Sequence, residues 1–276
     1  GTPLSRQDIN RLGEMPRFEI SNTGALAEFM NMEMNLTNPV LANRKVRQAI
    51  AYSLDRGFAA KTLMRGLGVV ANGPIAPWQP FYNGEVQETY PLDLGKARAL
   101  LEEAGYPEKS GGRFTLRVVA APWYEENPQM GAYIKQQLEG LGIKVELQTP
   151  DRSAAIKQIY VDREYDLSVS NNTSSVDPVL RTTTLYTSSN IGQVFRNASG
   201  YNNPEIDKIA KDMLFDPDAE KRMKMAADFQ RIVSEDVPIL PIAWKGNVMI
   251  FDKRVHNVTA RPEVQYDTWK DMWIEK

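Results

Sequence analysis

Hydrophobic and polar residues alternate along the chain in patterns that predict both strands and helices. Apolar residues at every second position predict strands at residues 114–120, 143–147 and 165–169. Between them, apolar stripes at helical spacing predict helices at residues 130–141 and 153–161. Strands that alternate with helices in this order form parallel sheets through right-handed crossovers. The pattern therefore indicates an α/β fold with helices on the faces of a sheet.

Further elements are predicted before this block. They are a strand at 28–35 and helices at 43–54, 58–67 and 94–104. Asn43 and Asp93 stand at N-cap positions, where a short side-chain oxygen accepts a bond from the first free amides of a helix. The segment 73–80 contains three prolines, which remove amide donors and fix φ, so we expect an irregular loop there.

The carboxyl-terminal third is predicted to hold two helices, one or two strands and a helical tail. Each helix starts with an Asn or Asp N-cap followed by proline at the first helical position, at Asn203-Pro204 and at Asp216-Pro217. Residues 239–251 are apolar enough for one strand or two. Trp269 and Trp273 stand at helical spacing in the tail.

Charge and composition exclude several classes of function. The chain of 276 residues has 33 Lys and Arg against 35 Asp and Glu, so no basic surface for nucleic acid is expected. It has no cysteine and one histidine, His256, which lies in a charged segment that predicts a surface position. We therefore expect no metal and no cofactor. No run approaches the roughly 20 apolar residues that span a bilayer, and residues 1–4 lack the features of a signal peptide.

Three loops at the carboxyl ends of the predicted parallel strands form the candidate site, because ligands of open α/β sheets bind at that edge. The loops cover residues 121–127, 149–152 and 171–178. The first offers aromatic faces and carboxylates that suit stacking and cation pairing, and the third offers neutral hydrogen-bonding groups. The candidate ligand-binding residues of the two loops are Trp123, Tyr124, Glu125, Asn171, Asn172, Thr173 and Ser174.

Two charged residues complete the candidate site, each with a structural alternative. Asp177 either contacts a ligand or caps the helix that follows it. Arg181, four residues later, either reaches an anionic group of a ligand or lies on a helix surface.

A carboxylate-based hydrolase is the enzymatic alternative. It would use Glu125 or Glu126 with Asp177, and two of these groups would have to lie within about 10 Å of each other in a cleft. A Ser-His-Asp site would have to use His256. No phosphate-binding glycine motif follows a predicted strand, and we expect a protein without enzymatic activity.

Several segments resemble motifs of the family 5 extracytoplasmic solute-binding proteins, which serve importers of dipeptides, oligopeptides, nickel, glutathione and opines. NRKVRQAIAYSLDR at 43–56 is similar to a helix of that family, and GPI at 73–75 is similar to the loop after it. The remaining matches follow in the family's order: ARALLEEAGYP at 97–107, QQLEGLGIKV at 136–145, YDL at 165–167, DP at 177–178, YNNPEID at 201–207 and EDVPILP at 235–241.

The resemblance implies a type II periplasmic-binding-protein-like lobe, with a mixed, largely parallel sheet flanked by helices. It covers the carboxyl-terminal half of family members. Residues 28–250 are then the second ligand-binding lobe with a crossover strand at each end. Residues 1–27 are a remnant of the first lobe and linker, and residues 251–276 are a tail that packs on the first lobe.

The resemblance also implies a function. The protein is expected to be a monomer, periplasmic or lipid-anchored outside the cytoplasm, that closes on a small solute and delivers it to the permease of an ABC importer. Peptide binders of the family carry an aspartate before the Asp-Pro pair, where residues 172–175 are neutral here, and dipeptide binders carry an arginine near 120–123 that is absent here. A solute other than a dipeptide is expected. A sensing or docking module without transport is the remaining alternative.

Overall fold

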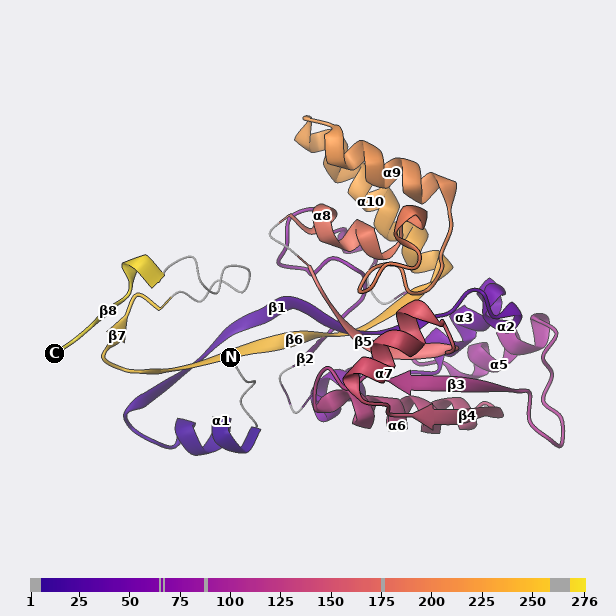
Figure 1. Cartoon of the computed structure of the whole chain (residues 1–276), viewed down its shortest axis with the longest axis horizontal. Helices are drawn as coiled ribbons and strands as arrows, with labels where there is room; N and C mark the ends of the chain where they lie inside the picture. The colour runs from indigo at the N-terminus through magenta and orange to yellow at the C-terminus, as the bar shows by residue number, and fades with distance from the viewer. Residues whose placement is uncertain (1–5, 65, 67, 87–88, 175–176, 259–268) are drawn as a thin grey trace.

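The computed structural model (Figure 1) describes residues 6–64, 66, 68–86, 89–174, 177–258 and 269–276. Its central feature is a six-stranded sheet in the order β2-β6-β1-β5-β3-β4. The strands are β1 (Phe18–Met34), β2 (Gly68–Val70), β3 (Phe114–Ala120), β4 (Ile143–Gln148), β5 (Leu167–Thr173) and β6 (Ile239–Asp252).

The predicted parallel unit is confirmed, and it forms one half of the sheet. β3 lies between β4 and β5 and pairs in parallel with both. β1 pairs antiparallel with β5 on one side and with β6 on the other. The sheet is therefore mixed, with the parallel strands at one end and the two longest strands, β1 and β6, side by side near the other.

Of the five long helices in the described ranges, four begin at a capping side chain. Asn43 accepts from the amide of Lys45 at the start of α3 (Arg44–Tyr52), and Asp93 accepts from the amide of Lys96 at the start of α5 (Leu94–Glu103). The other two are α9 (Pro204–Phe215) and α10 (Ala219–Asp236), whereas no side chain of the described residues caps the fifth long helix, α6 (Glu126–Glu139). The short ones are α1 (Arg6–Gly13), α2 (Pro39–Ala42), α4 (Arg56–Phe58), α7 (Arg152–Ile156) and α8 (Pro178–Thr182).

The two remaining predicted helices each contain a π-helical segment. The helix predicted at 58–67 begins earlier, capped by Asp55, as α4 and continues as a π-helix over Ala59–Leu63. The helix predicted at 153–161 is α7 followed by a π-helix over Lys157–Val161. Segment 73–80 is an irregular loop, as predicted.

Two predictions for the carboxyl-terminal third are corrected, the start of α10 and the helical tail, and the choice between one strand and two at 239–251 is decided. α10 starts at Ala219 because the side chain of Asp218, rather than Asp216, accepts the first amide bonds. β6 is one continuous strand, because it stays paired with β1 along its length. The predicted helical tail is wrong for residues 269–274, which form a 3-10 turn (Trp269–Asp271) and strand β8 (Trp273–Ile274). β8 pairs with β7 (Val255–His256), and the Trp273 ring stacks on His256.

Helices cover both faces of the sheet. On one face the side chains of α3, α5 and α6 pack on Met30, Leu116 and Val169. On the other face α8, α9 and α10 pack around Phe29 and Trp244, whose rings lie 4.8 Å apart. In Figure 1 α9 and α10 stand above the strands, and α3, α5 and α6 lie on the other side. The core thus consists of two layers separated by the sheet.

The outer parts of β1 and β6 leave this core together. β5 pairs with β1 only from Glu28 onward, and β2 pairs with β6 only at residues 243–245. Residues 18–25 of β1 pair with β6 alone, and register shifts lie on both sides of Ala25. Figure 1 shows this two-stranded ribbon, here called the β1–β6 ribbon, extending away from the helices toward β7, β8 and α1.

Candidate functional site

The carboxyl ends of β3, β4 and β5 bring the predicted loops to one edge of the sheet. The indole Nε1 of Trp123, after β3, donates to Ser170 Oγ on β5 at 3.1 Å. The guanidinium carbon of Arg152, after β4, lies 5.5 Å from the centroid of the Trp123 ring. Side chains from the three strand ends therefore meet, and we call this region the strand-end edge.

Trp123 and Tyr124 contact opposite faces of the sheet at this edge. Ser170, the partner of Trp123, pairs with Asn31 on β1, whereas Tyr124 hydrogen-bonds Glu28, three positions earlier on the same strand. Residues three apart on a strand face opposite sides. The edge therefore has two separate groups of side chains.

The first group, the Glu28 cluster, consists of Glu28, Tyr124, Glu126 and Lys245. Lys245 Nζ lies 3.3 Å from the centroid of the Tyr124 ring and 4.0 Å from Glu126 Oε1. Glu28 is 8% exposed, and burial raises the pKa of its carboxyl. Its Oε1 is buried without a hydrogen-bond partner. The cluster therefore contains a hydrogen-bond acceptor without a partner, Glu28 Oε1, and the ammonium group of Lys245.

The sequence analysis missed Glu28 and Lys245 as site residues. They lie on β1 and β6, far from the loops along the chain, and reach the edge only because these strands run beside β5. A signal was present, since a lysine within the apolar run of 239–251 requires a partner or solvent.

The second group, the aromatic cluster, consists of Trp123, Tyr160 and Phe195. The Phe195 ring lies 5.7 Å from that of Trp123 and 5.3 Å from that of Tyr160. Arg181 Nη2 donates to the backbone oxygen of Phe195 at 3.4 Å, so Arg181 lies beside this cluster. Phe195 was not predicted.

The residues predicted in the third loop separate. Asn171 has both polar side-chain atoms buried without a hydrogen-bond partner, and Thr173 is exposed. Asn172 points into the sheet interior, where its Nδ2 donates to Asn31 Oδ1 and Glu33 Oε1. Residues 171–173 belong to β5, so their side chains alternate between faces. Asn172 is therefore a core residue.

Ser174 and the proline-rich segment come together beyond the end of β5. Gln79 Nε2 donates to Ser174 Oγ at 3.2 Å, and Ser174 Oγ lies 3.4 Å from Thr182 Oγ1. Beside them, Trp78 packs edge-on against Trp244 at 5.7 Å. Residues 175–176 of the predicted loop lie outside the described residues.

Asp177 has the structural role that was its alternative. Its Oδ1 accepts from the amide of Val179 at the start of α8, and its Oδ2 accepts from Arg222 Nη2 at 2.6 Å. Glu125 is exposed, and Glu126 faces Lys245. Two of the three acids of the hydrolase alternative, Glu126 and Asp177, thus face cations of this chain.

A row of buried polar side chains, Asn31, Glu33 and Asn172, lies on the same face of the sheet as Ser170, the partner of Trp123. Glu33 is fully buried; its Oε1 accepts from Asn172 Nδ2 at 2.9 Å, while its Oε2 has no partner among the described residues. Burial raises the pKa of Glu33 to about 7. The carboxyl group is therefore held close to its neutral form.

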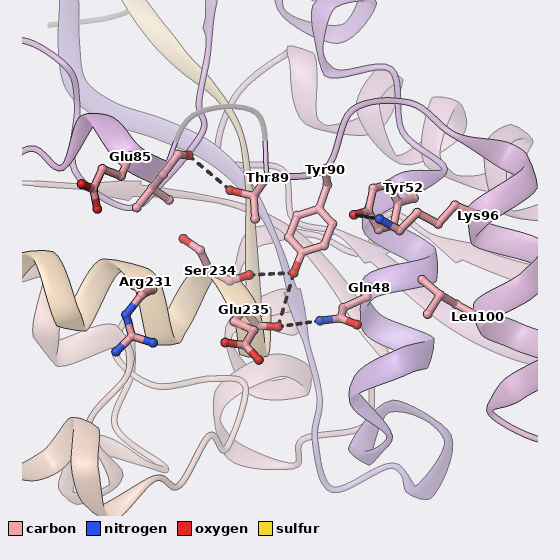
Figure 2. Close-up of a pocket in the computed structure, with 11 residues that line it drawn as sticks. Gln48, Tyr52, Glu85, Thr89, Tyr90, Lys96, Leu100, Arg231, Ser234 and Glu235 are labelled. Carbon is pink, nitrogen blue, oxygen red and sulfur yellow. Dashed lines mark hydrogen bonds between the residues drawn. The ribbon is translucent and has the colours of Figure 1, made fainter.

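A cavity of about 520 Å³ shares no residue with the strand-end edge. Figure 2 shows it between α3, α5 and the end of α10, with Tyr90 at its centre. The Tyr90 hydroxyl donates to the backbone oxygen of Ser234, and Lys96 donates to the Tyr52 hydroxyl at 2.6 Å. These hydrogen bonds link the lining residues of the cavity to one another, Tyr90 to the end of α10 and α5 to α3.

Within the residues that the structure describes, no group of three or more His, Cys, Asp and Glu side chains could hold a metal ion. Over the same part of the chain, no helix is both long and apolar enough to cross a membrane.

Comparison with known proteins places this geometry in context. The profile described as bacterial extracellular solute-binding proteins, family 5 Middle, matches residues 2–193. Heme-binding protein A of Haemophilus influenzae is 29% identical over 223 residues, which are 80% of this chain and 40% of that protein. Glutathione-binding protein GsiB of Escherichia coli is 23% identical, over 85% of this chain and 46% of its own. The chain thus spans less than half the length of these relatives.

Solved structures show the same fold. HbpA2 from Haemophilus parasuis superposes with a TM-score of 0.85 over 98% of this chain and 52% of that one, at 24% identity. The oligopeptide-binding protein AppA from Bacillus subtilis, in complex with a nonapeptide, superposes with a TM-score of 0.82 over 98% of this chain and 55% of that one, at 22% identity. The architecture is that of a lobe of a type II periplasmic binding protein.

Proposed function

Because the chain belongs to the bacterial extracellular solute-binding proteins of family 5, we propose that it captures a small solute for an ABC importer. The relatives are binding proteins rather than enzymes. The observation that supports a binding role most directly is the strand-end edge, where Glu28 and Asn171 have buried polar atoms without partners. Such atoms are costly unless a ligand or water satisfies them.

We further propose how the chain is divided. Residues 28–250 form the ligand-binding lobe, and residues 1–27 and 251–276 belong with a first lobe in the whole protein. The β1–β6 ribbon supports this division, because it leaves the helical layers and is paired on neither outer edge by β2 or β5. Closure of two lobes about such strands is a hinge motion that a solute stabilises through its higher affinity for the closed form.

The solute is proposed to be polar and other than a dipeptide. The relatives are named for heme, glutathione and peptides, all of which carry carboxylates. Trp123, Tyr124 and Arg181 line the edge with the aromatic and cationic groups that such ligands use. We place the protein outside the cytoplasm, periplasmic or lipid-anchored, working as a monomer with the permease.

A thermal-shift panel on the whole protein tests the proposed function. Glutathione, tri- to pentapeptides, hemin and a nickel–histidine chelate are each added at a concentration near 100 times a micromolar Kd. A bound solute then stabilises by about 2.7 kcal/mol, which raises Tm by at least about 2 °C.

Variants then locate the binding. Trp123→Ala is expected to abolish the shift, while Phe215→Ala, on an exposed side chain of α9, leaves it intact. If no solute in the panel raises Tm, the binding role is wrong; if Trp123→Ala keeps the full shift, the solute binds elsewhere.

A further inference from the structure

Two arginines lie beside Phe195 at the strand-end edge, and a third contacts the Trp123 ring of the same cluster. Arg181, on α8, donates to the backbone oxygen of Phe195, and Arg196 is the next residue, donating to Thr184 Oγ1 at 2.9 Å. The guanidinium carbon of Arg152 lies 5.5 Å from the centroid of the Trp123 ring, which packs on Phe195. Three cations from different segments thus lie beside residues of one aromatic cluster.

Carboxylates of the described residues do not neutralise these arginines. Within the described ranges no ion pair joins Arg152, Arg181 or Arg196 to an acid, whereas Arg222 nearby is paired with Asp177. The closest acid in sequence, Asp151, uses its Oδ1 to cap α7. Arg181 is partly buried, and burial together with the charge of Arg196 lowers its pKa. An anion bound here would offset the cost of burying the Arg181 charge and its repulsion by Arg196.

The aromatic cluster offers a flat surface beside these charges. The Phe195 side chain is 37% exposed although it packs on two other rings. Its backbone has φ of +59°, a left-handed conformation that an aromatic residue adopts at a cost. The ring is therefore partly exposed, on a residue whose backbone oxygen accepts a hydrogen bond from Arg181.

We propose that this end of the strand-end edge is an anion subsite for a carboxylate attached to a flat ring or conjugated system. The arginines bind the carboxylate and Phe195 packs on the ring. The inference rests on the proposed function and specifies its solute. The Glu28 cluster lies on the opposite face of the sheet and is not part of this subsite.

Calorimetry with a matched pair of small probes tests the subsite. The whole protein is titrated with 2-naphthoate and with its neutral analogue 2-naphthamide. One charge-assisted contact is expected to make naphthoate bind about 10-fold tighter. Arg152→Gln and Arg181→Gln should each remove most of this preference without changing the affinity for naphthamide, and Phe195→Ala should weaken both probes.

Arg98→Gln is the control, because Arg98 lies on α5 and contacts Gly140 far from the edge along the sheet. Arg181→Lys, which keeps the charge and loses the planar fork, is expected to retain part of the preference. Equal affinity for the two probes, a preference that survives both glutamine variants, or no binding of either probe overturns the subsite. The solute panel decides separately on the importer role, since a peptide or other solute can still raise Tm when the arginine variants have no effect.

Discussion

The carboxyl group of Glu33 is the residue-scale feature with the clearest consequence for stability. It is fully buried, one oxygen is bound by Asn172, and no cation faces it among the groups that influence it. The pKa values of three nearby tyrosines, Tyr160, Tyr165 and Tyr186, are raised. Burial is the largest cause for each of them, and the charge of Glu33 is the next largest. The pocket therefore favours the neutral acid.

Stability is expected to fall as pH rises from about 4.5 to 7. The pKa of Glu33 is about 7 in the folded protein, whereas the ordinary pKa of a glutamate, taken for the unfolded chain, is 4.5. Between these pH values the folded state therefore binds more protons than the unfolded state. The contribution is complete below pH 4.5 and lost above 7, on the order of 3 kcal/mol for a shift of this size. Denaturant unfolding at pH 5 and pH 8 measures the loss.

Glu33→Gln mimics the neutral acid and is expected to remove this part of the pH dependence. Glu146→Gln, on an exposed position of β4, is the control and should keep the wild-type profile. If the two variants have the same dependence on pH, Glu33 is not the group that titrates.

Residue-level expectations from the sequence were accurate where one segment determines the environment. The capping roles of Asn43 and Asp93 depend on neighbouring amides and were predictable. The buried position of Asn172 depends on where β5 ends, and the roles of Glu28 and Lys245 depend on which strands lie beside it. Strand neighbours follow from long-range pairing, which a local pattern does not contain.

At the scale of elements, the contact between α6 and β3 depends on a glycine. A Cβ on Gly131 would lie 2.8 Å from Ala120 Cβ and 3.0 Å from Leu147 Cδ1, so the helix could not approach the sheet as closely. Gly131→Ala is expected to destabilise by about 1 to 3 kcal/mol through overpacking, although alanine is the better helix former. Chemical denaturation measures this free energy.

Gly95→Ala is the matched substitution on α5, because a Cβ there meets only Asp93 Oδ1 at 3.4 Å. It is expected to stabilise by about 0.5 to 1 kcal/mol, in line with helix propensity. Stabilisation by both substitutions would show that α6 can shift away from the sheet without cost.

Elements were predicted well where the chain carries its own start and stop signals. The parallel unit of β3, β4 and β5 followed from alternating periodicities and was confirmed. The start of α10 was predicted wrongly because two residues beside Pro217, Asp216 and Asp218, could each cap it. Asp218 does so, and its side chain accepts hydrogen bonds from two amides of α10. The chain could not show that β6 continues through Lys245-Gly246-Asn247, because pairing with β1 holds that segment extended.

At the scale of the whole molecule, stability is expected to decrease from the helical layers to the β1–β6 ribbon. Residues 29–34 of β1 lie between β5 and β6, whereas residues 18–22 pair with β6 alone. Amides of residues 18–22 should therefore exchange with deuterium at least about 100-fold faster than those of residues 29–34 in this chain. Mass spectrometry of exchanged peptides measures the difference.

The same measurement on the whole protein checks the proposed division into lobes. Residues 114–120 of β3 serve as the reference, since they are central to the sheet in either case. If a first lobe packs on the ribbon, its amides become protected while the reference is unchanged. Equal exchange of the ribbon in both proteins would contradict the division.

The register shifts beside Ala25 give the ribbon a mechanical property. From Ala25 to Phe18 an extended strand spans about 23 Å at roughly 3.3 Å per residue. A bend of about 20° at the shifts therefore displaces the far end by roughly 8 Å, close to the spacing of about 10 Å between two sheets packed face to face. Under the proposed division into lobes, such a bend is expected to move a first lobe by this distance relative to the described one, without rearrangement of the helices.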